Sequence, residues 1–378
     1  MKKQGEKMSF ISATAIISGT AIGAGYLSIP YVISKTGFLP GIFYIVILGL
    51  IMLFFKLLLG EVTLRTRGQH QQTGYAEKYL GKIGKYLMFF AMIFGIFSAL
   101  VAYIIAEGQS ISYVFTGSFN YALYFSIGFW VLMCVLTYDG LHLLKRLGKF
   151  AILLVALFVI LLFIFFFKDI TLSNISYYSL DYKNLFLPFG VILFSFIGFS
   201  SIPEARRVLY ENEKLLKKTI IWGLVLPIVF YLVFTLILVG SFGKGVLEIA
   251  TFNLGRFFSI IAIITMFVSF FSQSLAIRDM FRFDFNLGRF KGWLLSSILP
   301  IILFLIVINF KSISFVDILS FAGIISSGLT AGIIILMNKK AKLEGDRKPE
   351  YSINLNKYVI SLAVIIFLLG IFSALMNI

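Results

Sequence analysis

The chain has 378 residues, of which 60% are hydrophobic and only 13% are charged. With a mean hydropathy of +0.98, this composition excludes an ordinary soluble domain and predicts an all-α membrane protein. The formal net charge is +16, and because most basic residues fall in alternate loops, it indicates membrane topology rather than nucleic-acid binding.

Charge-free runs long enough to cross a bilayer predict about eleven transmembrane helices. The first run is too long for a signal peptide, so we expect it to be retained. The expected spans are residues 10–34, 36–55, 86–106, 120–138, 150–167, 184–203, 219–243, 257–277, 292–310, 318–338 and 358–378.

The orientation of these spans follows from the loops between them. With the N-terminus in the cytoplasm, the inner loops hold 26 of the 33 Lys and Arg residues and the outer loops hold six. This asymmetry is the positive-inside pattern. We therefore expect a multi-pass protein of the cell membrane, in contact with lipid, with the N-terminus cytoplasmic and the C-terminus external.

The first span contains three glycines, Gly19, Gly23 and Gly25, near its centre. Each glycine costs about 1 kcal/mol relative to alanine in a helix, so a helix is expected to stop near residues 19–22 and restart near residues 24–25. Irregular backbone at bilayer depth is tolerated only where it is buried in protein or lines a watery cavity. The pattern predicts a broken helix at a binding site.

A second break is expected in the sixth span, at residues 194–203, where Ile197-Gly198 and Ser201-Ile202-Pro203 echo the first break. Five helices separate the two positions, so the spans run in opposite directions. Broken helices in corresponding places of inverted halves indicate a midplane site. The halves are expected at residues 9–168 and 184–338, with an extra helix at 357–378, in one transporter domain. The alternative is that the small residues only allow close helix packing.

A helix break offers two kinds of ligand a few ångströms apart. The last carbonyls before the break carry partial negative charge, and the first N–H groups after it carry partial positive charge. Gly25 lets the backbone approach a ligand closely, and the carbonyls of Ser195, Phe196 and Ile197 can accept from an ammonium group. A free amino acid is the zwitterion that uses both polarities, and the absence of a charged side chain here favours a neutral one.

The eighth span carries Thr265, Ser269 and Ser272 on one helical face. Hydroxyl and carbonyl oxygens are suitable ligands for Na⁺. Such hydroxyls also bond to neighbouring helices or to their own backbone, and the sequence leaves both readings open.

The sequence Gly-Thr-Ala-Ile-Gly-Ala-Gly-Tyr-Leu-Ser-Ile-Pro at 19–30, followed by Lys-Thr-Gly-Phe at 35–38, resembles the amino acid/auxin permease family. Weaker matches are Ile202-Pro203-Glu204 and Ile277-Arg278. The resemblance implies the LeuT fold, which has two inverted five-helix repeats plus a trailing helix and works by alternating access. It implies substrate contacts from Thr20, Ala21, Ala24, Gly25 and Ser195, Phe196, Ile197, Gly198, Phe199; we add Gly23, which lies in the same break.

The resemblance also implies a cation site formed by the carbonyls of Gly19 and Ile22 with Ser269 and Ser272. Sodium-coupled relatives often have asparagine where this chain has Gly19, so proton coupling competes with sodium coupling. No other metal and no cofactor is expected. The single cysteine, Cys134, excludes an intrachain disulfide and a cysteine-based metal site.

Several ionisable residues fall inside expected spans and are functional candidates for that reason. Glu204 and Glu107 are candidates for gating or proton transfer. Arg206 and Arg207 follow Glu204, which favours an inner-gate salt bridge; Glu107 could be solvated by an entrance vestibule. Lys56 is expected either to snorkel or to pair with Glu61.

These observations predict a secondary active transporter of neutral amino acids, coupled to Na⁺ or H⁺. The alternative is a sensor that binds an amino acid in the same pocket without net transport. An intramembrane enzyme is disfavoured because the chain has no paired catalytic constellation. The sequence leaves the oligomeric state open and is compatible with a monomer.

Overall fold

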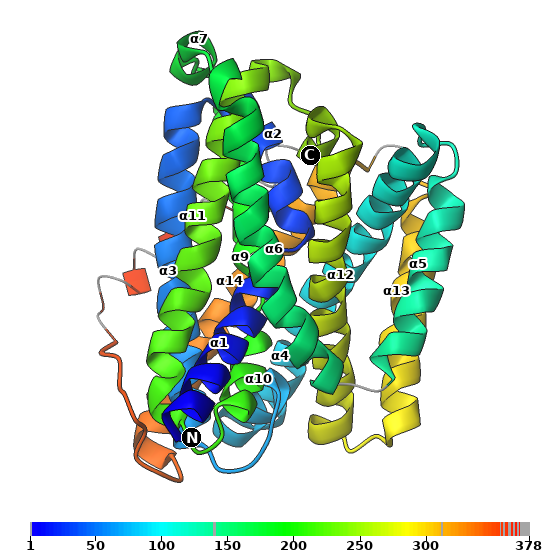
Figure 1. Cartoon of the computed structure of the whole chain (residues 1–378). Coiled ribbons are helices and arrows are strands. Elements are labelled where there is room, and N and C mark those ends of the chain that lie inside the picture. Colours follow the sequence, from blue (N-terminus) through cyan, green and yellow to red (C-terminus); the bar gives the residue numbers. More distant parts are fainter. Residues whose placement is uncertain are drawn as a thin grey trace.

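The computed structural model describes residues 2–138, 141–310 and 313–355, with residues 357, 360, 361, 364, 365, 367, 368 and 370 of the last segment. The described chain is helical almost throughout, and its long helices run roughly alongside one another in one bundle (Figure 1). An isolated antiparallel bridge joins Gly37 and Tyr178.

The elements before the second break occupy roughly the first half of the chain. They are α1 (Lys2–Ala21), η1 (Ala24–Ser28), α2 (Ile29–Thr36), α3 (Phe38–Arg65), α4 (Gln72–Thr116), α5 (Ala122–Thr137), α6 (Leu141–Phe166), η2 (Phe167–Asp169), α7 (Leu172–Ser176), α8 (Tyr182–Phe186) and α9 (Pro188–Phe196).

The remaining elements begin after the second break. They are α10 (Ser201–Val208), η3 (Glu213–Leu215), α11 (Leu216–Phe242), η4 (Gly243–Gly245), η5 (Ala250–Leu254), α12 (Arg256–Asp279), the π-helical turn η6 (Met280–Asp284), α13 (Arg289–Val307) and α14 (Phe315–Glu344).

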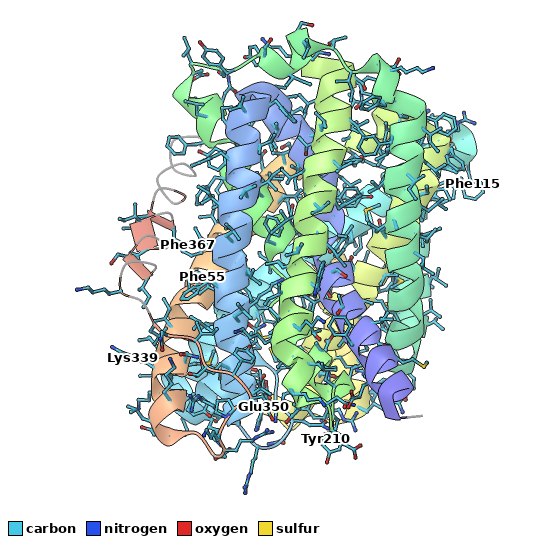
Figure 2. All side chains as sticks on the ribbon, turned by 60° about the vertical axis from the view of Figure 1, so that its left-hand side comes forward. Phe55, Phe115, Tyr210, Lys339, Glu350 and Phe367 are labelled. Carbon is cyan, nitrogen blue, oxygen red and sulfur yellow. The ribbon has the colours of Figure 1, made fainter. Side chains whose placement is uncertain are left out.

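Within the described residues, seven helices are long and apolar enough to cross a membrane. The pair Met8–Ala21 and Ala24–Thr36, bent by 45°, forms an eighth span. The shorter α5 and the 26-residue α6 match two further predicted spans. The predicted eleventh span, 358–378, lies largely outside the described residues, although Phe367 packs against Phe55 of α3 with ring centroids 6.1 Å apart (Figure 2).

Large apolar side chains cover the outside of the bundle. Phe43, Phe90, Val135 and Ile164 each expose more than half of their surface. Exposed apolar surface on this scale is stable against lipid tails and unstable against water. The helices therefore pack around a protein interior and present a second apolar face to the bilayer.

The two breaks lie in the middle of the bundle because the helix halves stack end to end. In Figure 1, α1 occupies the lower half and α2 the upper half of one span. In the neighbouring span α9 lies above α10. On the other side of the bundle, α5 and α13 are held together by indole N–H groups: Trp293 donates to the Cys134 carbonyl and Trp130 to the Ser297 carbonyl, each at 2.8 Å.

Residues 345–355, which we call the C-terminal linker, run across the end of the bundle where α1 begins (Figures 1 and 2). The buried Glu61 carboxylate of α3 binds three partners there. It accepts from Arg65 at 2.9 Å, from the Ser352 hydroxyl at 2.8 Å and from the Ile353 N–H at 2.8 Å. The predicted alternatives for Lys56 are both wrong, because Lys56 is fully buried and its ammonium has no partner among the described contacts.

A second carboxylate attaches the linker to the loop after α3. Asp346 accepts from the Arg67 N–H at 2.8 Å and pairs with Lys78. The Lys78 hydrogen bond and the Arg67 N–H hold the pKa of Asp346 below its usual value. This contribution to stability is present above the ordinary pKa of an aspartate and is lost as the pH falls through the lowered value.

We expect Glu61→Ala to destabilise the protein by roughly 3–5 kcal/mol, because it leaves the Arg65 guanidinium and two linker donors without their acceptor. The measurement is the apparent melting temperature in detergent. The matched control is Glu77→Ala, which removes a half-exposed carboxylate paired with Lys85 and is expected to cost less than about 1 kcal/mol. Equal melting temperatures for the two variants would contradict the role given to Glu61.

Candidate functional site

The first break lies where the sequence predicts it. α1 ends at Ala21, the Gly23 N–H turns back to the Ala21 carbonyl at 2.8 Å, and the chain restarts at Ala24. The carbonyls freed by the break find a side-chain donor, because the Ser269 hydroxyl of α12 lies 2.6 Å from Gly19 O and 3.0 Å from Ile22 O. Main-chain groups at bilayer depth are thus satisfied across two helices.

The second break is also confirmed. α9 ends at Phe196, where the Ile197 N–H bonds to the Phe194 carbonyl at 3.0 Å, and α10 begins at Ser201. Gly198 between them has φ +78°, a conformation that strains any residue with a side chain. A Cβ at Gly198 would also meet Thr20 of α1 at 2.8 Å.

The two breaks touch each other. A Cβ on Gly25 would lie 2.8 Å from Ser195 Cα and closer still to the Ser195 hydroxyl, so only glycine fits there. The buried Tyr231 of α11 joins the breaks from the other side. Its hydroxyl lies 2.6 Å from the carbonyl of Ala21, the last residue of α1, and 2.9 Å from the carbonyl of Ser195, in the last turn of α9.

A small cavity lies between the breaks. Its wall contains no charged side chain among the described residues. Six of the predicted substrate residues line it, together with five that the sequence analysis missed. The predicted ones are Thr20, Ala21, Gly25, Ser195, Ile197 and Gly198, and the others are Gly95, Ala99, Tyr103, Phe194 and Gln273.

Four predicted substrate residues do not line this cavity. Gly23 faces the Tyr103 hydroxyl, and the Phe196 ring packs on Tyr231 with centroids 5.0 Å apart. Ala24 and Phe199 are buried outside the lining set. Gln273 lies four residues after Ser269 on α12, so the spacing used for the hydroxyl face could have found it; Tyr103 has no local signal in the sequence.

The cavity measures about 10 Å³. A single water needs roughly 10–15 Å³ measured in this way, so an amino acid does not fit without movement. This conformation therefore leaves no room for the side chain of an amino acid. The site is contracted, with its polar groups satisfied by one another.

The predicted cation ligands separate into two groups. Gly19 O, Ile22 O and the Ser269 hydroxyl come together as predicted, with Thr265 O 3.2 Å from the same hydroxyl. Ser272 instead lies 2.8 Å from the Thr20 hydroxyl. The Thr265 hydroxyl donates to its own helix at Ala262 O, 2.9 Å away.

The predicted salt bridge of Glu204 with Arg206 or Arg207 is wrong. Glu204 is fully buried, and its nearest described partner is the Ser272 hydroxyl at 3.5 Å. Arg206 pairs with Glu213 and Arg207 with Asp279, each at 2.7 Å. The direction in which each arginine side chain leaves the helix decides which carboxylate it meets. Proximity to Glu204 in the sequence therefore did not predict the ion pairs.

Glu107 of α4 is also fully buried, so the predicted solvation by an entrance vestibule is wrong in this conformation. Neither carboxyl oxygen has a hydrogen-bond partner among the described contacts. Glu107 and Glu204 are thus the two glutamates that enter the protein interior without a cation beside them.

Comparisons with known proteins agree with this architecture. The tryptophan/tyrosine permease family matches residues 6–251. Glutamine transporter 2 of Aliivibrio fischeri is 23% identical over 333 residues, covering 82% of this chain and 83% of its own length. Tyrosine-specific transport system 1 of Haemophilus influenzae is 26% identical over 325 residues, covering 77% and 79%. The crystal structure of MhsT in complex with L-phenylalanine shares the fold, with a TM-score of 0.71, 16% identity, and coverage of 97% of this chain and 98% of MhsT.

Two broken helices meet inside an apolar bundle of membrane-spanning length, and the bundle has the fold of MhsT. The chain belongs to the tryptophan/tyrosine permease family. It is therefore an amino acid transporter and not an enzyme, which confirms the class predicted from the first break.

We expect Gly25→Ala to reduce transport at least tenfold, because the added methyl forces the backbones at Gly25 and Ser195 apart. Uptake of labelled amino acid in proteoliposomes measures the effect. Gly128→Ala is the control, since a Cβ there meets nothing within 4 Å. Wild-type uptake by Gly25→Ala would refute the close contact of the breaks.

Tyr231→Phe should lower transport while leaving the fold intact, because it removes one hydroxyl that joins the ends of α1 and α9. A net loss of about 1 kcal/mol in stability is expected for one hydrogen bond, measured as a small drop in melting temperature. Tyr121→Phe, at an exposed tyrosine, controls for loss of a hydroxyl in general. Unchanged uptake in Tyr231→Phe would remove Tyr231 from the site.

Proposed function

We propose that the protein is a secondary active transporter of neutral amino acids, which bind between the two broken helices. The observation that carries this proposal is the lining of the central cavity, which combines main-chain groups of both breaks with uncharged side chains. An acidic or basic substrate would bring a charge without a counter-charge to bilayer depth, at a high desolvation cost. A neutral zwitterion is balanced by the dipoles of the helix ends.

The carbonyls of Ala21 and Ser195 are the acceptors that we assign to the substrate ammonium. In the contracted state both are turned to the Tyr231 hydroxyl. We assign the N–H groups that open η1, at Gly25 in the cavity wall, to the substrate carboxylate. Opening of the site exchanges the Tyr231 contacts for contacts with the substrate.

We propose a proton as the coupling ion, carried by Glu204. A buried carboxylate with only a serine hydroxyl 3.5 Å away is costly when ionised, so the group holds a proton while the site is closed. The Ser272 hydroxyl connects Glu204 to Thr20, which lines the cavity. Water that enters on opening would allow the proton to leave, and this links its release to the substrate site.

Sodium is the second candidate, favoured by the oxygens around Ser269. Gly19 O, Ile22 O, Thr265 O and the Ser269 hydroxyl are hard ligands that converge from α1 and α12. In the contracted state, however, the three carbonyls share the single hydrogen of the Ser269 hydroxyl. Binding of Na⁺ would require the hydroxyl to turn and present its lone pairs instead.

The ion is identified by uptake in proteoliposomes under an imposed pH gradient or an imposed Na⁺ gradient. We expect accumulation with the pH gradient, and a loss of at least tenfold in Glu204→Gln, which keeps the shape but cannot exchange a proton. Ser269→Ala should retain pH-driven uptake. Accumulation only with Na⁺, abolished by Ser269→Ala and retained by Glu204→Gln, would reverse the assignment.

Substrate class is tested by competition of all common amino acids against one labelled neutral amino acid. Neutral amino acids should compete, and acidic and basic ones should not. The same vesicles separate transport from sensing, because a sensor would bind the label without accumulating it.

A further inference from the structure

A second, polar cavity of about 390 Å³ lies at the end of the bundle where α1 begins. It is bounded by α10, the segment around η3, the loop after α3 and the C-terminal linker. Four arginines line it, Arg67, Arg206, Arg207 and Arg347, against one carboxylate, Glu213. Tyr210 of this cavity and Glu350 of the linker lie at the same end of the molecule in Figure 2.

The carboxylates in reach do not balance these arginines. Glu213 is shared, since it accepts from Arg206 at 2.7 Å and also pairs with Arg347, which has Glu350 as a second partner. Asp279, behind the wall, is likewise shared by Arg207 at 2.7 Å and by Arg278 at 3.3 Å. His70, also in the lining, lies 3.9 Å from Asp284. The cavity therefore keeps an excess of positive charge.

Free donors remain in the wall. The Arg207 Nε–H is buried without a hydrogen-bond partner. The exposed Arg67 side chain has no hydrogen bond among the described contacts. The Asp346 carboxylate is nearby, but it accepts from the Arg67 backbone N–H. Each guanidinium offers five N–H groups in a planar fork, more than the pairs described above use, so donors are left for an anion.

We propose that this arginine pocket binds a phosphate group, presented either by a soluble anion or by the headgroup of an anionic lipid. Several guanidinium forks suit the unesterified oxygens of a phosphate, of which the free anion has four and a lipid phosphodiester two. Basic pockets between helices at this end of a membrane protein recognise lipid headgroups on the same chemistry. The proposal stands independently of the substrate and coupling ion.

Phosphate binding has a structural consequence for the linker. Glu213 joins Arg206 of α10 to Arg347 of the linker, so a phosphate competes with Glu213 for both arginines. A bound phosphate thereby weakens the connection between the linker and α10, the second half of the broken helix. Phosphate binding would therefore loosen the attachment of α10 to the C-terminal linker.

The test uses the full chain in detergent with inorganic phosphate as the probe, at constant ionic strength, followed by calorimetric titration and by the shift in melting temperature. Arg67→Gln is the primary variant, because this exposed side chain has no hydrogen bond to lose. Lys82→Gln is the matched control, since it removes one exposed positive charge next to Gly81, outside the pocket. We expect Arg67→Gln to weaken phosphate binding about tenfold, and Lys82→Gln to leave it unchanged.

Glu213→Gln gives a change of opposite sign. It removes the competing carboxylate and should tighten phosphate binding. Its melting temperature without phosphate is measured alongside, so that a folding defect is recognised.

A second arm identifies the source of the phosphate. The protein is reconstituted in phosphatidylcholine vesicles with or without phosphatidylglycerol, and the melting temperature is compared for wild type, Arg67→Gln and Lys82→Gln. A response to phosphatidylglycerol but not to inorganic phosphate, lost in Arg67→Gln alone, supports the proposal with a lipid as the ligand. The absence of both responses in wild type, or equal responses in all three proteins, overturns it.

Discussion

Backbone amides cannot be left without partners inside a bilayer, and the centre of this protein is arranged around that requirement. Two helices stop halfway, and their open ends are matched to each other and to hydroxyl groups. Ser269 serves the end of the first helix, and Tyr231 serves both helices at once. Glycines at the contact allow the backbones of the two breaks to approach closely enough to share these hydrogen-bond donors. The binding site is therefore a set of satisfied main-chain groups with a cavity too small for its ligand.

Much of this arrangement is encoded locally and could be predicted. Glycines at 19, 23 and 25 weaken one helix, so the first break follows from helix propensity, and the second follows from the similar residues at Gly198 and Pro203 in the other half. Long apolar runs likewise predict the spans, and most of them coincide with long apolar helices of the structure. These features depend on neighbours in the sequence, which is why they are legible without coordinates.

The wrong predictions of side-chain pairing have another cause, since the true partners are not the nearest charged residues in the sequence. Glu204 was matched to adjacent arginines, but those arginines bind Glu213 and Asp279 instead. Lys56 was matched to Glu61, whose partners are Arg65 and the C-terminal linker almost 300 residues away. Tyr103 and Tyr231 were overlooked because an isolated tyrosine in an apolar helix is common. Tertiary packing decides these contacts, and a single sequence carries no record of it.

The tyrosine between the two breaks has one more implication. A phenol has a single hydrogen to give, yet two carbonyls, those of Ala21 and Ser195, wait within reach of it. The phenol can donate fully to only one of them at a time, and the Ala21 carbonyl has the Gly23 N–H as a second donor. The ammonium group of a protonated primary amine has three hydrogens and can donate to both carbonyls at the same time. Replacement of the Tyr231 hydroxyl by an ammonium group would therefore give the two carbonyls more hydrogen-bond donors than the empty protein provides.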